Sequence, residues 1–170
     1  ALGASPIMSG EKSEAPDILK HAGALLLNIG TCTEEKVPLY EEMARCANEC
    51  NIPIVLDPVG YGASAFRRNL TDQLLSEYNI ALVKGNAGEI LALSGKEAVS
   101  KGVDSIIEGN TLDIAKAAHS LLDVPVLVTG EMDAYTDGKE EMTMHNGHKY
   151  QEVITGSGCV LGAITAAFLA

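Results

Sequence analysis

Two glycines and a serine stand directly before a cysteine in the run TGSGC at residues 155–159. An apolar, alanine-rich stretch follows and predicts a helix, which places Cys159 in its first turn. Backbone N–H groups at a helix N-terminus have no intrahelical partner, and the helix dipole adds partial positive charge there. Such a turn can bind an anion, most often phosphate, and it is the position where thiols become more acidic.

This motif by itself leaves a binding site and a plain turn equally open. It is not a P-loop, because no Gly-Lys-Ser/Thr follows. Gly156, Gly158 and Gly162 resemble a dinucleotide fingerprint, but no second strand–helix unit follows them. The glycines could simply form a tight turn into a helix, and Cys159 could be a small core residue.

Two carboxylates also stand at positions where chemistry is possible. Asp57 ends an apolar run just before a proline, and Glu89 follows Asn86 at Asn-x-x-Glu spacing around a helix start. Asn86 and Glu89 could form a capping box, which is the common meaning of that spacing. Alternatively, Asp57 and Glu89 could hold Mg²⁺ directly or through water, because magnesium keeps several waters and needs only one or two carboxylates besides substrate phosphates.

Alternating strand-like and helix-like runs must position these residues. Continuously apolar strands are predicted at residues 23–30, 52–60, 80–86 and 124–130, and helices at 38–51, 69–79, 87–95 and 111–122. Asp-Gly and Asn-Gly pairs predict hairpins between residues 133 and 153. The predicted fold class is α/β, with a mainly parallel central sheet covered by helices on both faces.

The predicted order of elements brings the reactive residues to one edge of the sheet. In such sheets ligands bind beyond the carboxyl ends of the strands. Asp57, Lys84 with Asn86, and Thr129 each end a predicted strand, and TGSGC follows the last β-branched run. We therefore expect these groups to converge on a single site.

Composition narrows the class of protein. The 170 residues are 46% hydrophobic, which predicts one domain over residues 1–170 with a sizeable core. A net charge of −11 argues against nucleic acid and anionic membranes as partners, and no apolar run is long enough for a bilayer. Four cysteines without a C-x-x-C pair, and no recognisable signal peptide, predict reduced thiols in the cytoplasm. Both ends lack the usual element boundaries, so we expect a domain that is incomplete at its N- and C-termini.

Two other pairs could be metal ligands but have simpler explanations. Cys46 and Cys50 lie four residues apart on the apolar face of a predicted helix, which indicates packing. His145 and His148 flank an Asn-Gly pair, which indicates an exposed hairpin.

The motifs, taken in order, resemble those of the hydroxyethylthiazole kinases, which belong to the ribokinase-like superfamily. The matching runs cover essentially the whole chain, and together they are specific: GASPIM, LLLNIGT, LDPVGYGASAFR, GNAGEI, VTGEMD, HNGH and TGSGC. The resemblance implies a ribokinase-like fold and phosphorylation of the hydroxyl of 4-methyl-5-(2-hydroxyethyl)thiazole in thiamin salvage. ATP would be the phosphoryl donor and Mg²⁺ the cofactor.

The resemblance also assigns roles to individual residues. Met8 and Gly156 would contact the thiazole substrate, and Cys159 would lie beside its hydroxyl. The residues assigned to ATP are Lys84, Asn86, Thr129 and Gly158. Asp57 and Glu89 would serve Mg²⁺. The family usually has arginine where this chain has Lys84, which keeps the charge but lacks the bidentate fork, and Ser157 replaces a usual alanine.

The resemblance implies a homotrimer with substrate sites at subunit contacts. Two alternatives remain open beside this reading. One is a related ribokinase-like enzyme, such as a hydroxymethylpyrimidine or pyridoxal kinase or an ATP-dependent repair dehydratase for hydrated nicotinamide cofactors; Cys159 counts against it, because aspartate is expected there in those enzymes. The other is a non-catalytic module that binds a nucleotide or a thiazole.

Overall fold

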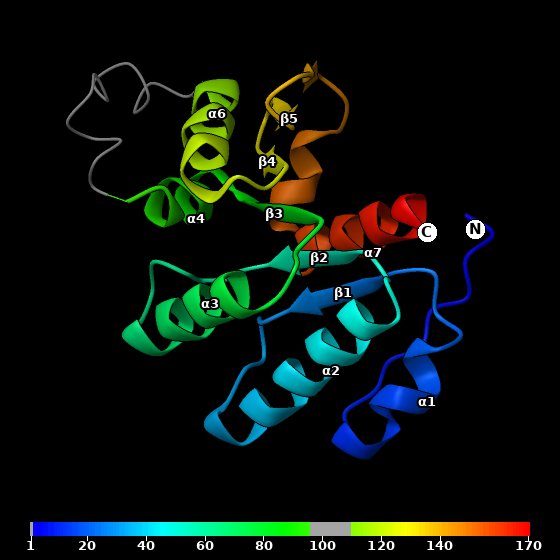
Figure 1. Cartoon of the computed structure of the whole chain (residues 1–170). Coiled ribbons are helices and arrows are strands. Elements are labelled where there is room, and N and C mark those ends of the chain that lie inside the picture. The colour runs from blue at the N-terminus through cyan, green and yellow to red at the C-terminus, as the bar shows by residue number, and fades with distance from the viewer. Residues whose placement is uncertain (1, 96–109) are drawn as a thin grey trace.

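Six strands form the central sheet of the computed structural model, which describes residues 2–95 and 110–170 (Figure 1). The strands lie side by side in chain order: β1 (Leu25–Asn28), β2 (Ile54–Asp57), β3 (Leu82–Asn86), β4 (Val126–Thr129), β5 (Asp133–Thr136) and β6 (Glu141–Met144). The first four are parallel, whereas β5 and β6 form an antiparallel hairpin at one edge. The predicted mainly parallel α/β sheet is therefore confirmed.

Helices cover both faces of this sheet, as predicted. Their bounds are α1 (Ala15–Leu19), α2 (Val37–Glu49), α3 (Ala65–Glu77), α4 (Ala87–Leu93), α6 (Thr111–Leu122) and α7 (Ser157–Leu169), with short 3-10 turns η1 (Lys12–Glu14), η2 (Glu34–Lys36) and η3 (Lys149–Val153). Helices α1, α2, α3, α4 and α6 share one large apolar core with the sheet. Helix α7 covers the opposite face, where Ala166 packs against Val55 and Leu82 (Figure 1).

Strand alternation decides which side chains face α7. Successive side chains of a strand point to opposite faces. Leu56 of β2 belongs to the large core, so Val55 and Asp57 point toward α7. The same alternation puts Asn28 of β1 and Lys84 of β3 on the α7 face. Three polar side chains from neighbouring parallel strands thus lie beneath one helix.

Most predicted elements are present, with differences at their ends. Helix α6 covers the predicted residues 111–122, and α2 begins and ends within two residues of the prediction. Helix α3 begins earlier than predicted, at Ala65, because the hydroxyl of Ser64 accepts a hydrogen bond from the N–H of Arg67 and caps the helix.

The hairpin predicted around the Asn-Gly pair at residues 146–147 is wrong. After β6 the chain passes into η3, where His148 accepts a hydrogen bond from the N–H of Tyr150 at 3.3 Å. The β-branched residues before TGSGC do not form a strand either, since Val153 closes η3 and Ile154 follows it in a bend. Strand preference depends on pairing and burial, and both of these side chains are exposed.

Candidate active site

The first turn of α7 forms one wall of the candidate site. Gly156 precedes the helix with φ of 89°, in the left-handed region that favours glycine. The N–H of Val160 donates the first helical hydrogen bond, to the carbonyl of Gly156 at 3.0 Å. The N–H groups of Gly158 and Cys159 come before that bond, so they are available to an anion. The exposed Cys159 lies in the first turn, where the sequence places it.

Asp57 is the centre of a polar network beneath this turn. Its Oδ2 accepts a hydrogen bond from Asn28 Nδ2 at 2.9 Å and forms an ion pair with Lys84 Nζ at 3.3 Å. Lys84 Nζ also donates to the carbonyl oxygen of Gly158 at 2.9 Å. Asn28 Nδ2 donates in addition to Cys159 Sγ at 3.2 Å. A single carboxylate oxygen is thereby connected to β1, β3 and the start of α7.

Lys84 is buried under α7, with only 3% of its surface exposed. A side chain at position 158 would place its Cβ 3.2 Å from Lys84 Nζ, so glycine there leaves room for the ammonium group. Two of the three ammonium hydrogens point to Asp57 and to the carbonyl of Gly158. Lys84 therefore docks α7 on the sheet and has one hydrogen left for a ligand.

The second oxygen of Asp57 is the unusual atom of the site. Asp57 Oδ1 is buried and has no hydrogen-bond partner among the residues that the structure describes, and an unpartnered buried polar atom is costly. Burial raises the pKa of Asp57 above its ordinary value, although Lys84 and Asn28 act to lower it. A cation at Oδ1 would satisfy this oxygen and favour its charged form. The donor chemistry thus fits a hard divalent ion such as Mg²⁺.

Asn86 and Glu89 form the capping box that was one of their two predicted meanings. Asn86 Oδ1 accepts from the N–H of Glu89, and Glu89 Oε2 accepts from the N–H of Asn86, both at 2.9 Å. Glu89 Oε1 also accepts from the N–H of Gly60, at 2.9 Å, in the turn after β2. The negative charge of Glu89 contributes to the raised pKa of Asp57.

Two other predicted site residues are less closely connected to this network. Thr129 ends β4 directly opposite Asn86, and its hydroxyl donates to the carbonyl of Gly85 at 3.3 Å. It therefore lies at the same sheet edge. Met8 is 98% exposed, so within one chain its side chain packs against none of the site residues.

Two residues of the site escaped the sequence interpretation. Asn28 could have been noticed, because it is a single polar residue at the end of a buried apolar run. Arg67 ends the family-like run LDPVGYGASAFR, but the sequence assigns it no role. Its guanidinium donates to the carbonyls of Ile29, Gly30 and Val59 at 2.8, 3.0 and 2.7 Å. Arg67 thereby holds together the loops that follow β1 and β2.

The other candidate pairs do not make a metal centre. Cys46 is buried in α2 as expected, but Cys50 is exposed because the helix ends at Glu49, so its predicted packing is wrong. His145 and His148 are both exposed. Over residues 2–95 and 110–170, no three His, Cys, Asp or Glu side chains gather around a common point. In the same part of the chain, no helix has the length and apolar character needed to cross a bilayer.

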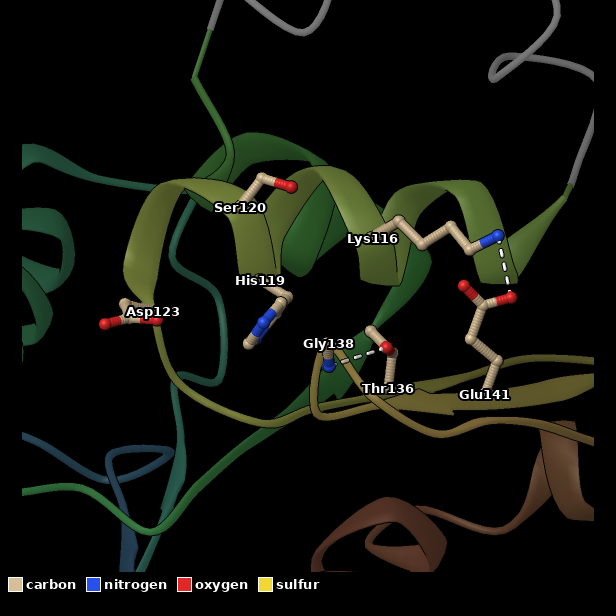
Figure 2. Close-up of a pocket in the computed structure, with 7 residues that line it drawn as sticks. All are labelled: Lys116, His119, Ser120, Asp123, Thr136, Gly138 and Glu141. Atoms are coloured by element: carbon tan, nitrogen blue, oxygen red, sulfur yellow. Dashed lines mark hydrogen bonds and ion pairs between the residues drawn. The ribbon is translucent and has the colours of Figure 1, made fainter.

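An open hollow of about 550 Å³ lies between α6 and the β5–β6 hairpin. Figure 2 shows it, lined by Lys116, His119, Ser120, Asp123, Thr136, Gly138 and Glu141. Thr136 pairs with Val126 at the start of β4, so the hollow borders the amino edge of the parallel strands. It is therefore separate from the site at their carboxyl edge.

Gly138→Ala is expected to destabilise the fold more than Gly95→Ala. Both glycines have left-handed φ, of 83° and 74°, which costs another residue about 1 kcal/mol. Of these two positions, only Gly138 would bring the new Cβ onto a side chain within residues 2–95 and 110–170. That side chain is the imidazole of His119, whose Nδ1 lies 2.9 Å from the carbonyl of Val124. That overlap adds about 1–3 kcal/mol to the loss of stability in Gly138→Ala.

Urea denaturation of both variants measures this difference. When Gly138→Ala is combined with His119→Ala, the protein should regain the part of the unfolding free energy that the overlap removed. Equal losses of stability in the two single variants would show that the hairpin moves away from α6 without cost.

The fold and the site together define a class of protein. A parallel α/β sheet with a buried Asp–Lys pair and a helix N-terminus at its carboxyl edge is suited to binding a phosphorylated ligand. A sequence model described as the hydroxyethylthiazole kinase family matches residues 1–170. The chain therefore belongs to the hydroxyethylthiazole kinase family.

Individual relatives agree with this assignment. Hydroxyethylthiazole kinase 1 from Streptococcus pneumoniae strain CGSP14 is 46% identical over 169 residues, and the same protein name and identity occur in strain ATCC 700669. The match covers 99% of this chain but 65% of each relative, so the chain spans about 65% of their length. A solved hydroxyethylthiazole kinase structure from Pyrococcus horikoshii OT3 superposes with a TM-score of 0.83 at 35% identity. That superposition covers 98% of this chain and 62% of the other.

Proposed function

We propose that this chain is a kinase domain that transfers the γ-phosphoryl group of ATP to the hydroxyl of 4-methyl-5-(2-hydroxyethyl)thiazole. The observation that carries the proposal is the meeting of Asp57, Lys84 and the first turn of α7 at one sheet edge. These groups supply a carboxylate, an ammonium and free N–H groups within one network. Membership of the family supports the thiazole alcohol as the acceptor.

The N–H groups of the α7 turn hold the charge that develops on the transferred phosphoryl group. Gly156 and Gly158 allow the backbone to approach it closely, because neither carries a side chain. Cys159 lies beside the substrate hydroxyl and takes part in moving its proton. Phosphoryl transfer through a loose transition state needs little proton abstraction at its start. Positioning of the reactants and stabilisation of the developing charge therefore account for most of the rate enhancement.

Lys84, Asn86 and Thr129 contribute to the nucleotide side of the site. Lys84 has one ammonium hydrogen left for a phosphate oxygen, while Asn86 and Thr129 stand opposite each other at the ends of β3 and β4. Because Lys84 is also tied to Asp57, phosphate binding and cation binding share one network.

Asp57 and Glu89 would hold Mg²⁺. Asp57 offers the unpartnered Oδ1 as a ligand. Both oxygens of Glu89 already accept backbone N–H groups, which suits contact through a water molecule. When bound, the ion supplies charge neutralisation for the phosphates of ATP.

Glu89→Gln is expected to raise the Mg²⁺ concentration needed for half-maximal rate by about tenfold. The amide keeps the shape of the side chain but can accept only one of the two N–H groups, so stability should fall by about 1 kcal/mol. Titration of the kinase rate with Mg²⁺ measures the first effect. Glu35→Gln, at an exposed position, makes the same charge change and serves as the control. A normal Mg²⁺ requirement with reduced stability would leave Glu89 as a helix cap only.

The assay of the function uses the full-length protein with Mg·ATP and the thiazole alcohol. Formation of ADP together with the phosphorylated thiazole, identified by mass spectrometry, is the expected result. Hydroxymethylpyrimidine and pyridoxal serve as competing acceptors. ADP formation with one of those and not with the thiazole would replace the proposed acceptor, and nucleotide binding without turnover would indicate a binding module.

The proposed active unit is a homotrimer in the cytoplasm. Leu2, Ile7 and Met8 are exposed apolar residues near the start of the chain, which supports burial against another subunit. Met8 would then contact the thiazole in a site completed by two chains. The four cysteines are free thiols, which supports a reducing compartment.

A further inference from the structure

We propose that Asn28 is a positioning residue that holds the Cys159 sulfur and the Asp57 carboxylate in one fixed arrangement. This inference rests on the kinase site proposed above. Asn28 is half-buried at the end of β1, directly opposite Asp57 in the sheet register. Its side chain is the link between that strand end and the first turn of α7.

The orientation of the Asn28 amide follows from its partners. The N–H of Gly30 donates to Oδ1 at 2.9 Å, which identifies that atom as the acceptor. Nδ2 therefore faces Asp57 Oδ2 at 2.9 Å and Cys159 Sγ at 3.2 Å. An amide nitrogen has two hydrogens, so one is donated to each partner and both are used.

The anchor of this amide is rigid. Arg67 holds the carbonyls of Ile29 and Gly30, which are the residues that immediately follow Asn28. Cys159 is exposed, and its side chain has three staggered χ1 positions. The hydrogen bond from Asn28 selects one of them. Asn28 thereby aims the sulfur toward the space above Asp57.

Asn28→Asp removes both donated hydrogens and keeps the shape of the side chain. Asn28→Ala removes the group, and Asn28→Ser retains one short donor. Asn48→Asp is the matched control, because Asn48 also bridges through both amide atoms, to the N–H and the carbonyl of Asn79, far from the site. Circular dichroism and urea denaturation identify the variants that fold.

The first readout is alkylation by iodoacetamide at pH 7.5, followed for each cysteine by mass spectrometry. The exposed Cys50 serves as an internal reference thiol. Without this hydrogen bond the sulfur is spread over three χ1 positions, so the Cys159 to Cys50 rate ratio should fall about threefold in Asn28→Asp and Asn28→Ala. Asn28→Ser should lie between Asn28→Ala and the parent, and Asn48→Asp should match the parent.

The second readout is steady-state phosphorylation of the thiazole alcohol. The kcat should fall about tenfold in Asn28→Ala with KM nearly unchanged, because the residue arranges reacting groups rather than binding substrate. An unchanged alkylation ratio in folded Asn28 variants would overturn the proposal, as would an equal change in Asn48→Asp. If the Asn28 variants show a lowered ratio but the parent protein phosphorylates no thiazole, the Asn28 arrangement is supported and the proposed function is rejected.

Discussion

Replacing Asp57 by alanine is expected to abolish phosphoryl transfer and to lower the free energy of unfolding by about 3–5 kcal/mol. The side chains of Asp57 and Lys84 are only 1% and 4% exposed. Removing the carboxylate leaves a buried ammonium without a countercharge, which is among the most destabilising single changes. The same variant removes the oxygen proposed to bind Mg²⁺.

A second substitution separates these two effects. Asp57→Ala combined with Lys84→Met should recover much of the lost stability, because an apolar replacement of a buried ion pair is close to neutral. Activity should stay absent. The four proteins of this cycle are compared by urea denaturation and by the kinase assay.

An exposed ion pair provides the control for this cycle. Lys116 and Glu141 are 2.8 Å apart with about half of each side chain exposed. Replacing either residue of this exposed pair should lower the free energy of unfolding by less than about 1 kcal/mol. If the losses of unfolding free energy in Asp57→Ala and Lys84→Met simply add up in the double variant, the buried pair is not coupled.

Replacing Cys159 by serine is expected to slow turnover by up to about 100-fold, with little change in KM. A full general base contributes roughly 10²- to 10⁴-fold, and a loose transition state places this site at or below the low end. Serine keeps the shape and loses the acidity of the thiol. Its hydroxyl can still accept the hydrogen bond from Asn28.

Cys159→Asp should retain turnover, because a carboxylate in the first helical turn can take the substrate proton and faces the same Asn28 donor. Steady-state kinetics of both variants in the full-length enzyme test the role. A folded but inactive Cys159→Asp would reject this position as the base. Complete loss of turnover in Cys159→Ser would instead indicate strictly thiol-dependent chemistry.

Local patterns in the sequence determined the elements and the edge at which the site lies. Apolar runs separated by amphipathic helices predict a mainly parallel sheet, and in such a sheet Asp57, Lys84 and Thr129 must end on the same side. The capping box of Asn86 and Glu89 is equally local, since both partners lie within one helical turn. The position of Cys159 in a first turn follows from the glycines before it.

Tertiary structure alone decided which of these groups touch. The ion pair of Asp57 with Lys84 depends on the register of β2 and β3, and the contact of Asn28 with Cys159 joins residues 131 positions apart. Of the residues before TGSGC, Val153 ends a 3-10 turn and Ile154 follows it, and neither forms a strand. Strand formation requires a paired edge and not only β-branched side chains. Such contacts depend on how α7 lies across the sheet, which no run of neighbouring residues specifies.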